Sequence, residues 1–312
     1  MSAETVSRDA AAALWYVSRR QGQPPREAIE TPGEVPGGNG LRVGIQGEPG
    51  SFSHQAAKQL METCKVVPFA LSADVFTALA GEQIDAAVIP IENSLAGSVV
   101  EHFDLLLTHD VCVEQETLLR IHHNLIALPG VDISGIERVF SHPVALAQCR
   151  DFLADHPRME AFSFYDTAGS VKQLVELQDH HAAAIASAAA AAYYGAQILA
   201  ANIEDNRENF TPFFLVRRRK DAQTRAGANK VSIAFSLENR PGSLVAALAD
   251  LSSLGTNLTK IESRPVHGKP WEYIFYVDCQ IRDADEADLS VKALAPHCAM
   301  VKELGRYPEA AR

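Results

Sequence analysis

The sequence predicts an α/β protein in which a two-lobed domain of alternating strands and helices precedes a smaller domain of different strand order. Strand-like and helix-like segments alternate over residues 41–220, whereas after residue 230 the order becomes strand, helix, strand, strand, helix, strand. The length of 312 residues also suggests about two domains, and 47% apolar with 21% charged residues is ordinary for a globular chain.

Residues 1–40 are expected to be a weakly structured leader that belongs to neither domain. Proline and glycine interrupt every periodic pattern at 23–25 and 32–40, although 10–20 has the composition of one short helix. Folded sequence is therefore expected to begin with the strand at 41–47.

The first domain, 41–220, is expected to consist of two lobes around a largely parallel sheet. Its strands are predicted at 41–47, 66–68, 86–91, 111–121, 124–127, 138–141, 161–165, 183–185 and 211–216. Its helices are predicted at 53–60, 73–80, 98–107, 144–153, 170–177 and 188–199. The stretch 112–127 contains no helix and suits a strand that crosses between two lobes, with a small-ligand cleft between them.

The second domain, 230–312, follows a polar linker at 221–229. Its strands are predicted at 230–238, 258–264, 272–280 and 300–303, and its helices at 243–254 and 284–294. This order makes a ferredoxin-like βαββαβ unit. A loop over a helix N-terminus can grip an amino-acid carboxylate, so the turns at 239–244 and 261–265 are either such a site or ordinary turns punctuated by Pro and Gly.

Charge and cysteine content exclude several classes of protein. The net charge is −11, so nucleic acid is not an expected partner, and the basic run 217–220 is expected to be the solvated edge of the linker. Five cysteines without a Cys-x-x-Cys pair fit neither a disulfide framework nor a zinc ribbon and indicate a reducing compartment. Neither an export signal nor a membrane-spanning apolar run is apparent, so a cytoplasmic location is expected.

Two polar clusters follow strands of the first lobe. In the glycine turn after the first strand, the hydroxyls of Ser51 and Ser53 could add donors to the unpaired amides of a helix start, which bind anions. The alternative is a plain turn in which serine caps the helix. In the second cluster, Asn93 and Ser94 can donate to a carboxylate or a hydroxyl, while Glu92 orients them.

Two further clusters repeat the pattern. The third cluster, at 165–170, contains a strand end followed by the hydroxyl of Thr167, a glycine and a helix start. In the fourth cluster, Asn209 and Thr211 stand at the start of a later strand. Together the four clusters describe a cleft that binds a small anionic molecule through neutral donors. His142, at another strand end, is a candidate for the same cleft.

The sequence indicates no metal or nucleotide site. The adjacent histidines at 122–123 and 180–181 have no partner at metal-ligand spacing, and neighbours on a strand point to opposite faces, so they are expected to be structural or on the surface. Gly-x-Gly-x-x-Gly, Walker, Gly-x-Ser-x-Gly and His-Glu-x-x-His motifs are missing from the sequence. Nucleotide binding, acyl-serine chemistry and zinc proteolysis therefore lose support.

In its motifs the chain resembles the monofunctional prephenate dehydratases of phenylalanine biosynthesis, which carry a C-terminal ACT regulatory domain. The resemblance covers residues 42–304. Its catalytic motifs are Gly47-x-Pro49-Gly50-Ser51-Phe52-Ser53, Pro90-Ile91-Glu92-Asn93-Ser94 with Gly97, Ser141-His142-Pro143 with Ala145-Leu146-Ala147-Gln148-Cys149, Asp166-Thr167-Ala168, Ala183-Ala184-Ile185-Ala186-Ser187 and Asn209-x-Thr211. The ACT motifs are Gly242-Ser243-Leu244-Val245 and Glu262-Ser263-Arg264-Pro265.

The resemblance implies a catalytic fold like that of type II periplasmic binding proteins, with the active site between two lobes, in a homodimer or homotetramer. It implies conversion of prephenate to phenylpyruvate, water and carbon dioxide without a metal or organic cofactor, and allosteric regulation by phenylalanine. Thr211 matches the family's essential threonine, which would donate to the leaving hydroxyl.

The resemblance also assigns roles to the other polar residues. The residues expected to hold the two substrate carboxylates are Ser51, Asn93, Ser94, Thr167 and Ser187, with Glu92 positioning its neighbours. Further substrate-binding residues are expected at Ser53, Asn209 and Phe213. The residues expected to bind phenylalanine are Asn239, Pro241, Gly242, Ser243, Leu244, Val245, Glu262, Ser263, Arg264 and Pro265.

One position departs from the family, because Thr-Arg-Phe has become Thr211-Pro212-Phe213. If the arginine pairs with a substrate carboxylate, its loss weakens binding, since such a bond is worth about 1.5–3 kcal/mol. If it only supports the strand, proline costs little where a strand starts. Arg207 is a possible substitute, and a milder change places Ser243 where alanine is common.

Three functions remain open on these grounds. The leading hypothesis is a prephenate dehydratase inhibited by phenylalanine. A dehydratase that prefers arogenate differs by one group in the cleft. A non-catalytic amino-acid sensor is favoured by Pro212 alone, and Thr211 with the four polar clusters stands against it. An exported solute-binding protein would share the fold but would need a signal peptide.

Overall fold

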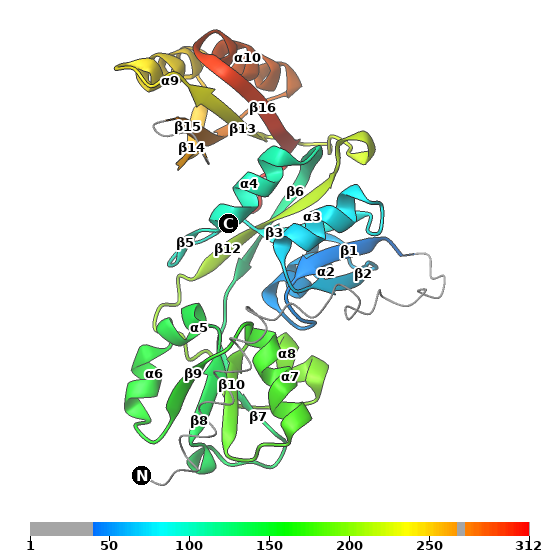
Figure 1. Cartoon of the computed structure of the whole chain (residues 1–312), viewed down its shortest axis with the longest axis vertical. Coiled ribbons are helices and arrows are strands. Elements are labelled where there is room, and N and C mark those ends of the chain that lie inside the picture. Colours follow the sequence, from blue (N-terminus) through cyan, green and yellow to red (C-terminus); the bar gives the residue numbers. More distant parts are fainter. Residues whose placement is uncertain (1–39, 267–271, 312) are drawn as a thin grey trace. The chain divides into compact units, whose positions relative to one another are not determined.

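The computed structural model describes residues 40–266 and 272–311, and the following concerns this part of the chain. The predicted leader therefore lies outside the described residues, apart from Gly40. The predicted fold class is confirmed: two α/β lobes precede a βαββαβ domain (Figure 1).

The first lobe is a five-stranded sheet in the order β2-β1-β3-β12-β6. Its strands are β1 (Arg42–Gln46), β2 (Lys65–Phe69), β3 (Ala86–Pro90), β6 (Val111–Arg120) and β12 (Phe210–Arg218). Its helices are α2 (Phe52–Leu60), α3 (Ser72–Ala80) and α4 (Val100–Thr108). A short hairpin, β4 (Glu92–Asn93) with β5 (Gly97–Ser98), stands between β3 and α4.

The second lobe has a sheet in the order β11-β7-β10-β8-β9. Its strands are β7 (Asn124–Ala127), β8 (Arg138–Ser141), β9 (Glu160–Ser163), β10 (Ala182–Ala186) and β11 (Gln197–Ala200). Its helices are α5 (Pro143–Ala147), α6 (Arg150–Asp155), α7 (Thr167–Leu177) and α8 (Ala188–Tyr194), with a 3-10 turn η1 (Ile133–Gly135).

Three details of the predicted first domain are wrong. Neither sheet is largely parallel, because β12 is antiparallel to β3 and β6 in the first lobe, and β7 is antiparallel to β10 and β11 in the second. The helix predicted at 144–153 is two helices, α5 and α6, separated at Gln148 and Cys149. The helix predicted at 188–199 ends at Tyr194, since Gly195 takes a left-handed φ of 67°, and the chain continues as β11.

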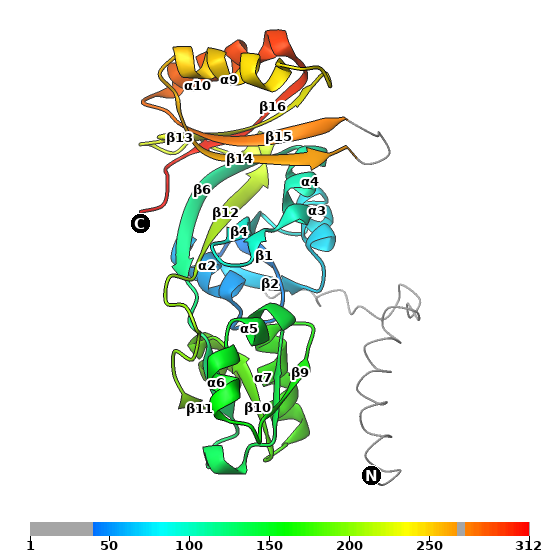
Figure 2. The same cartoon turned by 90° about the vertical axis from the view of Figure 1, so that its left-hand side faces the viewer.

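The C-terminal domain is an antiparallel sheet in the order β14-β15-β13-β16, with two helices on one face (Figure 2). Its elements are β13 (Lys230–Leu237), α9 (Ser243–Ser253), β14 (Asn257–Pro265), β15 (Tyr273–Gln280), α10 (Ala284–Leu294) and β16 (Cys298–Tyr307). Short 3-10 turns, η2 (Arg219–Asp221) and η3 (Ala295–His297), precede β13 and β16. β16 is longer than predicted because its second half packs against the first lobe.

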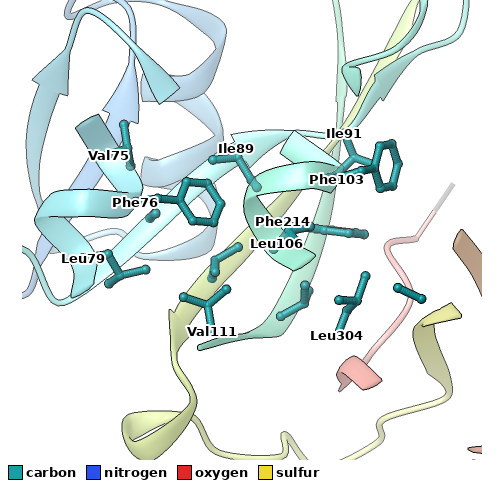
Figure 3. Packing of buried hydrophobic residues seen from close by; sticks show 14 of the residues in the cluster. Val75, Phe76, Leu79, Ile89, Ile91, Phe103, Leu106, Val111, Phe214 and Leu304 are labelled. Atoms are coloured by element: carbon teal, nitrogen blue, oxygen red, sulfur yellow. The ribbon is translucent and has the colours of Figure 1, made fainter. Parts of the chain in front are cut away.

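One hydrophobic cluster joins the first lobe to the C-terminal domain (Figure 3). Phe76 of α3, Phe103 of α4 and Phe214 of β12 belong to it, together with Leu304 and Tyr307 of β16. Burial of such large side chains stabilises by about 1.5–3 kcal/mol each, so the two parts are coupled by their shared core.

Gly305 of β16 lies against the backbone of β6 and provides a test of this junction. A Cβ atom at this position would be 2.1 Å from the Val113 carbonyl oxygen. We therefore expect Gly305→Ala to lower the free energy of unfolding by about 2 kcal/mol, measured by urea denaturation. Gly135→Ala is the control, because nothing lies within 4 Å of its Cβ position, and equal stability of the two variants would contradict the prediction.

Only the second half of the basic run 217–220 is the solvated edge that its composition predicts, since Arg219 and Lys220 are exposed whereas Arg217 and Arg218 are partly buried. Arg217 and Arg218 belong to β12, and the Arg218 side chain is only 15% exposed. Its guanidinium donates to the carbonyl oxygens of Leu79 at 3.0 Å and Ile84 at 2.8 Å, which lie at and after the end of α3. Arg217 pairs with Glu114 at 2.7 Å. Arg217 and Arg218 therefore satisfy polar groups of the first lobe.

Candidate active site

Three of the predicted site residues meet where β12 begins. The Asn93 Nδ2 atom on β4 donates to Thr211 Oγ1 at 2.9 Å and to Asn209 Oδ1 at 2.6 Å. Asn209 is fully buried and Thr211 is 6% exposed. Because Thr211 Oγ1 accepts from Asn93, its own hydrogen can be donated to another acceptor.

Gln148 completes a closed ring of side-chain amides with these two asparagines. Asn93 donates to Asn209, Asn209 Nδ2 donates to Gln148 Oε1 at 2.9 Å, and Gln148 Nε2 donates to Asn93 Oδ1 at 3.2 Å. The Asn93 oxygen also accepts from the amides of Leu95 and Ala96. The ring therefore fixes the amide of Asn93 with its NH₂ group toward Thr211.

Sequence reasoning did not single out Gln148 or His123 as functional residues. His123 is 2% exposed, and its Nε2 atom lies 2.9 Å from Gln148 Oε1, an atom that only accepts. His123 therefore carries its hydrogen on Nε2. Burial lowers the pKa of His123, which favours a neutral imidazole. The position of Gln148 in the motif 145–149 was its only signal in the sequence.

Ser94 and Glu92 flank Asn93 but have other partners. The Ser94 hydroxyl donates to Glu208 O and accepts from Phe210 N, both at 2.9 Å, so it fixes the start of β12. The Glu92 carboxylate accepts from Lys260 of β14. It thus lies toward the C-terminal domain, whereas its predicted role was to orient Asn93 and Ser94.

The helix starts of the predicted anion clusters lie where the two lobes touch. Ser51 caps α2, its Oγ accepting from His54 N at 3.3 Å, and Ser187 caps α8. The Ser187 hydroxyl donates to Gly50 O at 2.7 Å, which links the lobes. Gly50 is required here, because its φ is 85° and a Cβ atom would lie 2.6 Å from Ala190 Cα.

Ser53 and Thr167 belong to the same helix starts. Ser53 is 8% exposed within α2, and Thr167 is the first residue of α7. His142 caps α5, its Nδ1 accepting from Val144 N at 3.3 Å, so it acts locally in this structure.

A second set of contacts between the lobes centres on Glu48. Its carboxylate accepts from Tyr165 OH at 2.9 Å and from Lys172 Nζ at 3.1 Å. Asp166 caps α7 by accepting from Gly169 N at 2.6 Å and also accepts from the Glu48 amide. Burial in this contact raises the pKa of Asp166 to about 6. The two lobes are therefore held together at the rim of the site.

Pro212 lies on the opposite face of β12 from Thr211. It lines a cavity of about 330 Å³ with Lys230, Lys260 and Glu116. The Pro212 carbonyl accepts from Ile91 N at 3.0 Å. Proline has no N–H to donate to the Ile91 carbonyl, but that carbonyl accepts from Val99 N at 2.8 Å instead. The proline therefore leaves no unsatisfied carbonyl at Ile91.

Phe213 and Arg207 have simpler positions. Phe213 shares the face of Thr211 but is 2% exposed and packs in a core cluster with Val43, Ile45 and Leu215. The structure thus places its ring beneath Thr211, in the core. Arg207, the possible substitute for the missing arginine, is exposed.

The residues predicted to bind phenylalanine form two segments of the C-terminal domain. Asn239, Pro241 and Gly242 precede α9, and Gly242 caps it with a left-handed φ of 87°. Ser243, Leu244 and Val245 form the first turn of α9. The second segment, Glu262–Pro265, is the end of β14. Within it Glu262 accepts from Ser98 at 2.9 Å and Arg264 pairs with Asp104 at 3.2 Å.

Residues 40–266 and 272–311 contain neither a metal-binding cluster nor a membrane-spanning helix. This part of the chain contains no group of three or more His, Cys, Asp or Glu side chains arranged to hold a metal ion. None of its helices has the length and apolarity that crossing a bilayer requires.

Comparisons with known proteins agree with this arrangement. The family model described as prephenate dehydratase matches residues 43–221, and that of the ACT domain matches residues 231–292. The chain is 38% identical over 284 residues to arogenate dehydratase/prephenate dehydratase 2, chloroplastic, of Arabidopsis thaliana. The alignment covers 88% of this chain and 74% of the relative.

Two solved structures share most of the fold. The prephenate dehydratase of Arthrobacter aurescens in complex with L-Phe is 30% identical, with a TM-score of 0.79 over 86% of this chain and 90% of that one. GqqA, described as a novel type of quorum quenching acylase, is 29% identical, with a TM-score of 0.79 over 86% of this chain and 98% of that one. With a matching catalytic domain over more than half its length and an ACT domain after it, the chain belongs to the prephenate dehydratase family.

Proposed function

We propose that the chain catalyses the decarboxylating dehydration of prephenate to phenylpyruvate, carbon dioxide and water. The single observation that carries the proposal is the contact between Asn93 Nδ2 and Thr211 Oγ1 at 2.9 Å. It orients the threonine so that its hydrogen is available to the ring hydroxyl of the substrate as that hydroxyl departs. Thr211 stabilises developing charge by this hydrogen bond and keeps its own proton, since an aliphatic hydroxyl is a very weak acid.

The surroundings of Thr211 suit this reaction because they are neutral and buried. Aromatisation of the ring drives the step, so the protein must hold the substrate, assist loss of the hydroxyl and leave the departing carboxylate poorly solvated. The amide ring supplies fixed dipoles without a competing charge. Ser51, Ser53 and Thr167 at the helix starts are the donors that we assign to the substrate carboxylates, since both hydrogens of Asn93 Nδ2 are used by Asn209 and Thr211. Ser187 joins them when its bond to Gly50 opens.

The experiment is to measure phenylpyruvate formed by the purified protein from prephenate, with arogenate as a parallel substrate. Release of phenylpyruvate from prephenate supports the proposal. Release of phenylalanine from arogenate at a higher kcat/KM would assign the chain to the arogenate-preferring alternative. Inactivity toward both, with retained binding of phenylalanine, would support the amino-acid sensor.

We further propose that phenylalanine binds between the loop before α9 and the end of β14 and inhibits turnover. Gly242 opens the backbone ahead of a helix N-terminus, which suits the carboxylate of an amino acid. Ser243 Oγ and Arg264 Nε are buried polar atoms with no hydrogen-bond partner in the described part of the chain. A bound amino acid would satisfy such atoms, and inhibition follows by linkage if it favours a less active arrangement.

Arg264→Ala tests the effector site. We expect the phenylalanine concentration for half inhibition to rise about tenfold or more, because a charge-assisted hydrogen bond is lost. Uninhibited kcat should stay within about threefold, since the pair with the half-exposed Asp104 contributes little. Gly242→Ala is expected to act in the same direction. Equal losses of turnover and inhibition in both variants would contradict separate sites.

We also propose a homodimer or homotetramer in a reducing compartment, the cytoplasm. The C-terminal domain exposes Val245 at 72% and Ile261 at 50%, apolar side chains that a second copy could cover. All five cysteines are free thiols, and burial raises the pKa of each. Light scattering of the purified protein and fractionation of the source cell test these two statements.

A further inference from the structure

The β4–β5 hairpin has one face toward Thr211 and the other toward the C-terminal domain. Neighbouring residues of a strand point to opposite sides, and Asn93 donates to Thr211 while Glu92 contacts Lys260. Glu92 is paired across the hairpin with Ser98. The hairpin is thus the element that carries Asn93 and also touches the neighbouring domain.

Strand β14 holds both members of that cross-strand pair. Lys260 donates to Glu92 Oε2, and Ser98 Oγ donates to Glu262 Oε2 at 2.9 Å. Lys260 and Glu262 are two residues apart and therefore share one face of β14. Two contacts from a single strand fix the hairpin in position more firmly than one contact does.

The ammonium group of Lys260 is itself held in place. Its side chain is 13% exposed, and Nζ lies 5.2 Å from the centroid of the Phe103 ring. Phe103 in turn packs on Tyr276 of β15, with ring centroids 4.9 Å apart. Solvent screens the ion pair mainly from the side of Glu92, which is 40% exposed. A cation held in this way and paired directly with Glu92 can set the position of the strand that bears Glu92.

We propose that Lys260 is a positioning residue for the dehydration, supplied by the C-terminal domain. Through Glu92 it holds the β4–β5 hairpin so that Asn93 keeps its hydrogen bond to Thr211. The same strand continues into Glu262 and Arg264, so a ligand bound there moves the hairpin and lowers turnover. This inference rests on the proposed roles of Thr211 and of phenylalanine, and it adds the contact that connects them.

The test compares Lys260→Ala, Lys260→Arg and Glu92→Gln, alone and in the combination Lys260→Ala with Glu92→Gln. We expect Lys260→Ala to lower kcat about tenfold with KM within about twofold, because the reacting group is misplaced while substrate binding is kept. Lys260→Arg should restore most of kcat. The double variant should be no worse than either single one, which is the signature of a single interaction.

Phenylalanine provides the second readout. In Lys260→Ala we expect phenylalanine to bind with a Kd within about threefold of wild type by calorimetry, while its maximal inhibition falls by at least about threefold. Lys292→Ala, an exposed lysine of α10 in the same domain, is the matched control and should change neither quantity. Melting temperatures of all variants identify any that fail to fold.

The outcomes separate this inference from the proposed function. Wild-type kcat and full inhibition in Lys260→Ala overturn the positioning role, even if the wild type makes phenylpyruvate. Additive losses in the double variant, or failure of Lys260→Arg to recover activity, overturn it as well. A wild type that is inactive on prephenate and arogenate defeats the proposed function first.

Discussion

Thr211→Val is expected to lower kcat for phenylpyruvate formation by roughly a hundredfold to a thousandfold, the usual cost of removing one donor from a site that stabilises developing negative charge. Valine keeps the shape of threonine and removes only the hydroxyl. The loss should appear in kcat and in kcat/KM equally, with KM nearly constant, because the bond to the leaving hydroxyl strengthens only as that group departs. Stopped assays of purified enzyme at saturating prephenate measure it.

Two neighbouring substitutions control for damage to the strand. Thr211→Ser keeps a hydroxyl that can accept from Asn93 and should retain activity within about tenfold of wild type. Pro212→Ala changes the next residue on the opposite face of β12, away from Thr211, and should stay within about threefold. Loss of activity in Pro212→Ala equal to that in Thr211→Val would show that the strand, and not the hydroxyl, had been damaged.

The position of Pro212 bears on a choice that the sequence left open. Alternation along β12 places residue 212 on the face of the cavity lined by Lys230 and Lys260, and residue 211 on the other face. An arginine at 212 would therefore enter a cavity lined by four carboxylates (Glu92, Glu116, Asp278 and Glu309) and two lysines, where protein carboxylates could pair with it. This arrangement favours the interpretation that the residue supports the strand, and it leaves no argument from Pro212 for a non-catalytic sensor.

Much of the fold and part of the site followed from the sequence because both depend on local patterns. Short apolar runs ended by polar residues located β3, β10 and β12, and strand ends brought Asn93, Asn209 and Thr211 together. The change in the order of strands and helices after residue 230 located the second domain. The alanine tract after 188 was misassigned, since its periodicity gives no end to a helix and only the left-handed Gly195 stops it.

Other features depend on contacts between distant residues, which no local pattern encodes. Gln148 reaches Asn93 because the helix predicted at 144–153 breaks there, and the break was not visible in the sequence. Lys260 contacts Glu92 across 168 positions of chain. The basic residue Arg218 was assigned to solvent because its charge was visible and the carbonyl groups that it satisfies were not.

Gln148→Glu is expected to open the amide ring at neutral and alkaline pH while it keeps the size of the side chain. An ionised glutamate cannot donate to Asn93 Oδ1, and its charge would face an oxygen 3.2 Å away. We expect kcat to fall about a hundredfold at pH 8, since Asn93 is no longer fixed toward Thr211. The free energy of unfolding should fall by about 1–3 kcal/mol, because the half-buried carboxylate keeps its donors Asn209 and His123 but leaves Asn93 Oδ1 facing an acceptor.

The pH dependence of Gln148→Glu distinguishes this cause from general damage. Partial burial and the facing Asn93 Oδ1 oppose the ionised form, so the pKa of the new glutamate in the folded protein should lie above its unfolded value of about 4.3. A protonated carboxyl can donate to Asn93 Oδ1 and close the ring again. The ratio of variant to wild-type kcat should therefore rise as pH falls through the folded pKa, and the stability loss should shrink between that pKa and the unfolded value. Gln83→Glu, at an exposed turn, should show neither effect, and a pH-independent ratio in Gln148→Glu would remove the ring from the mechanism.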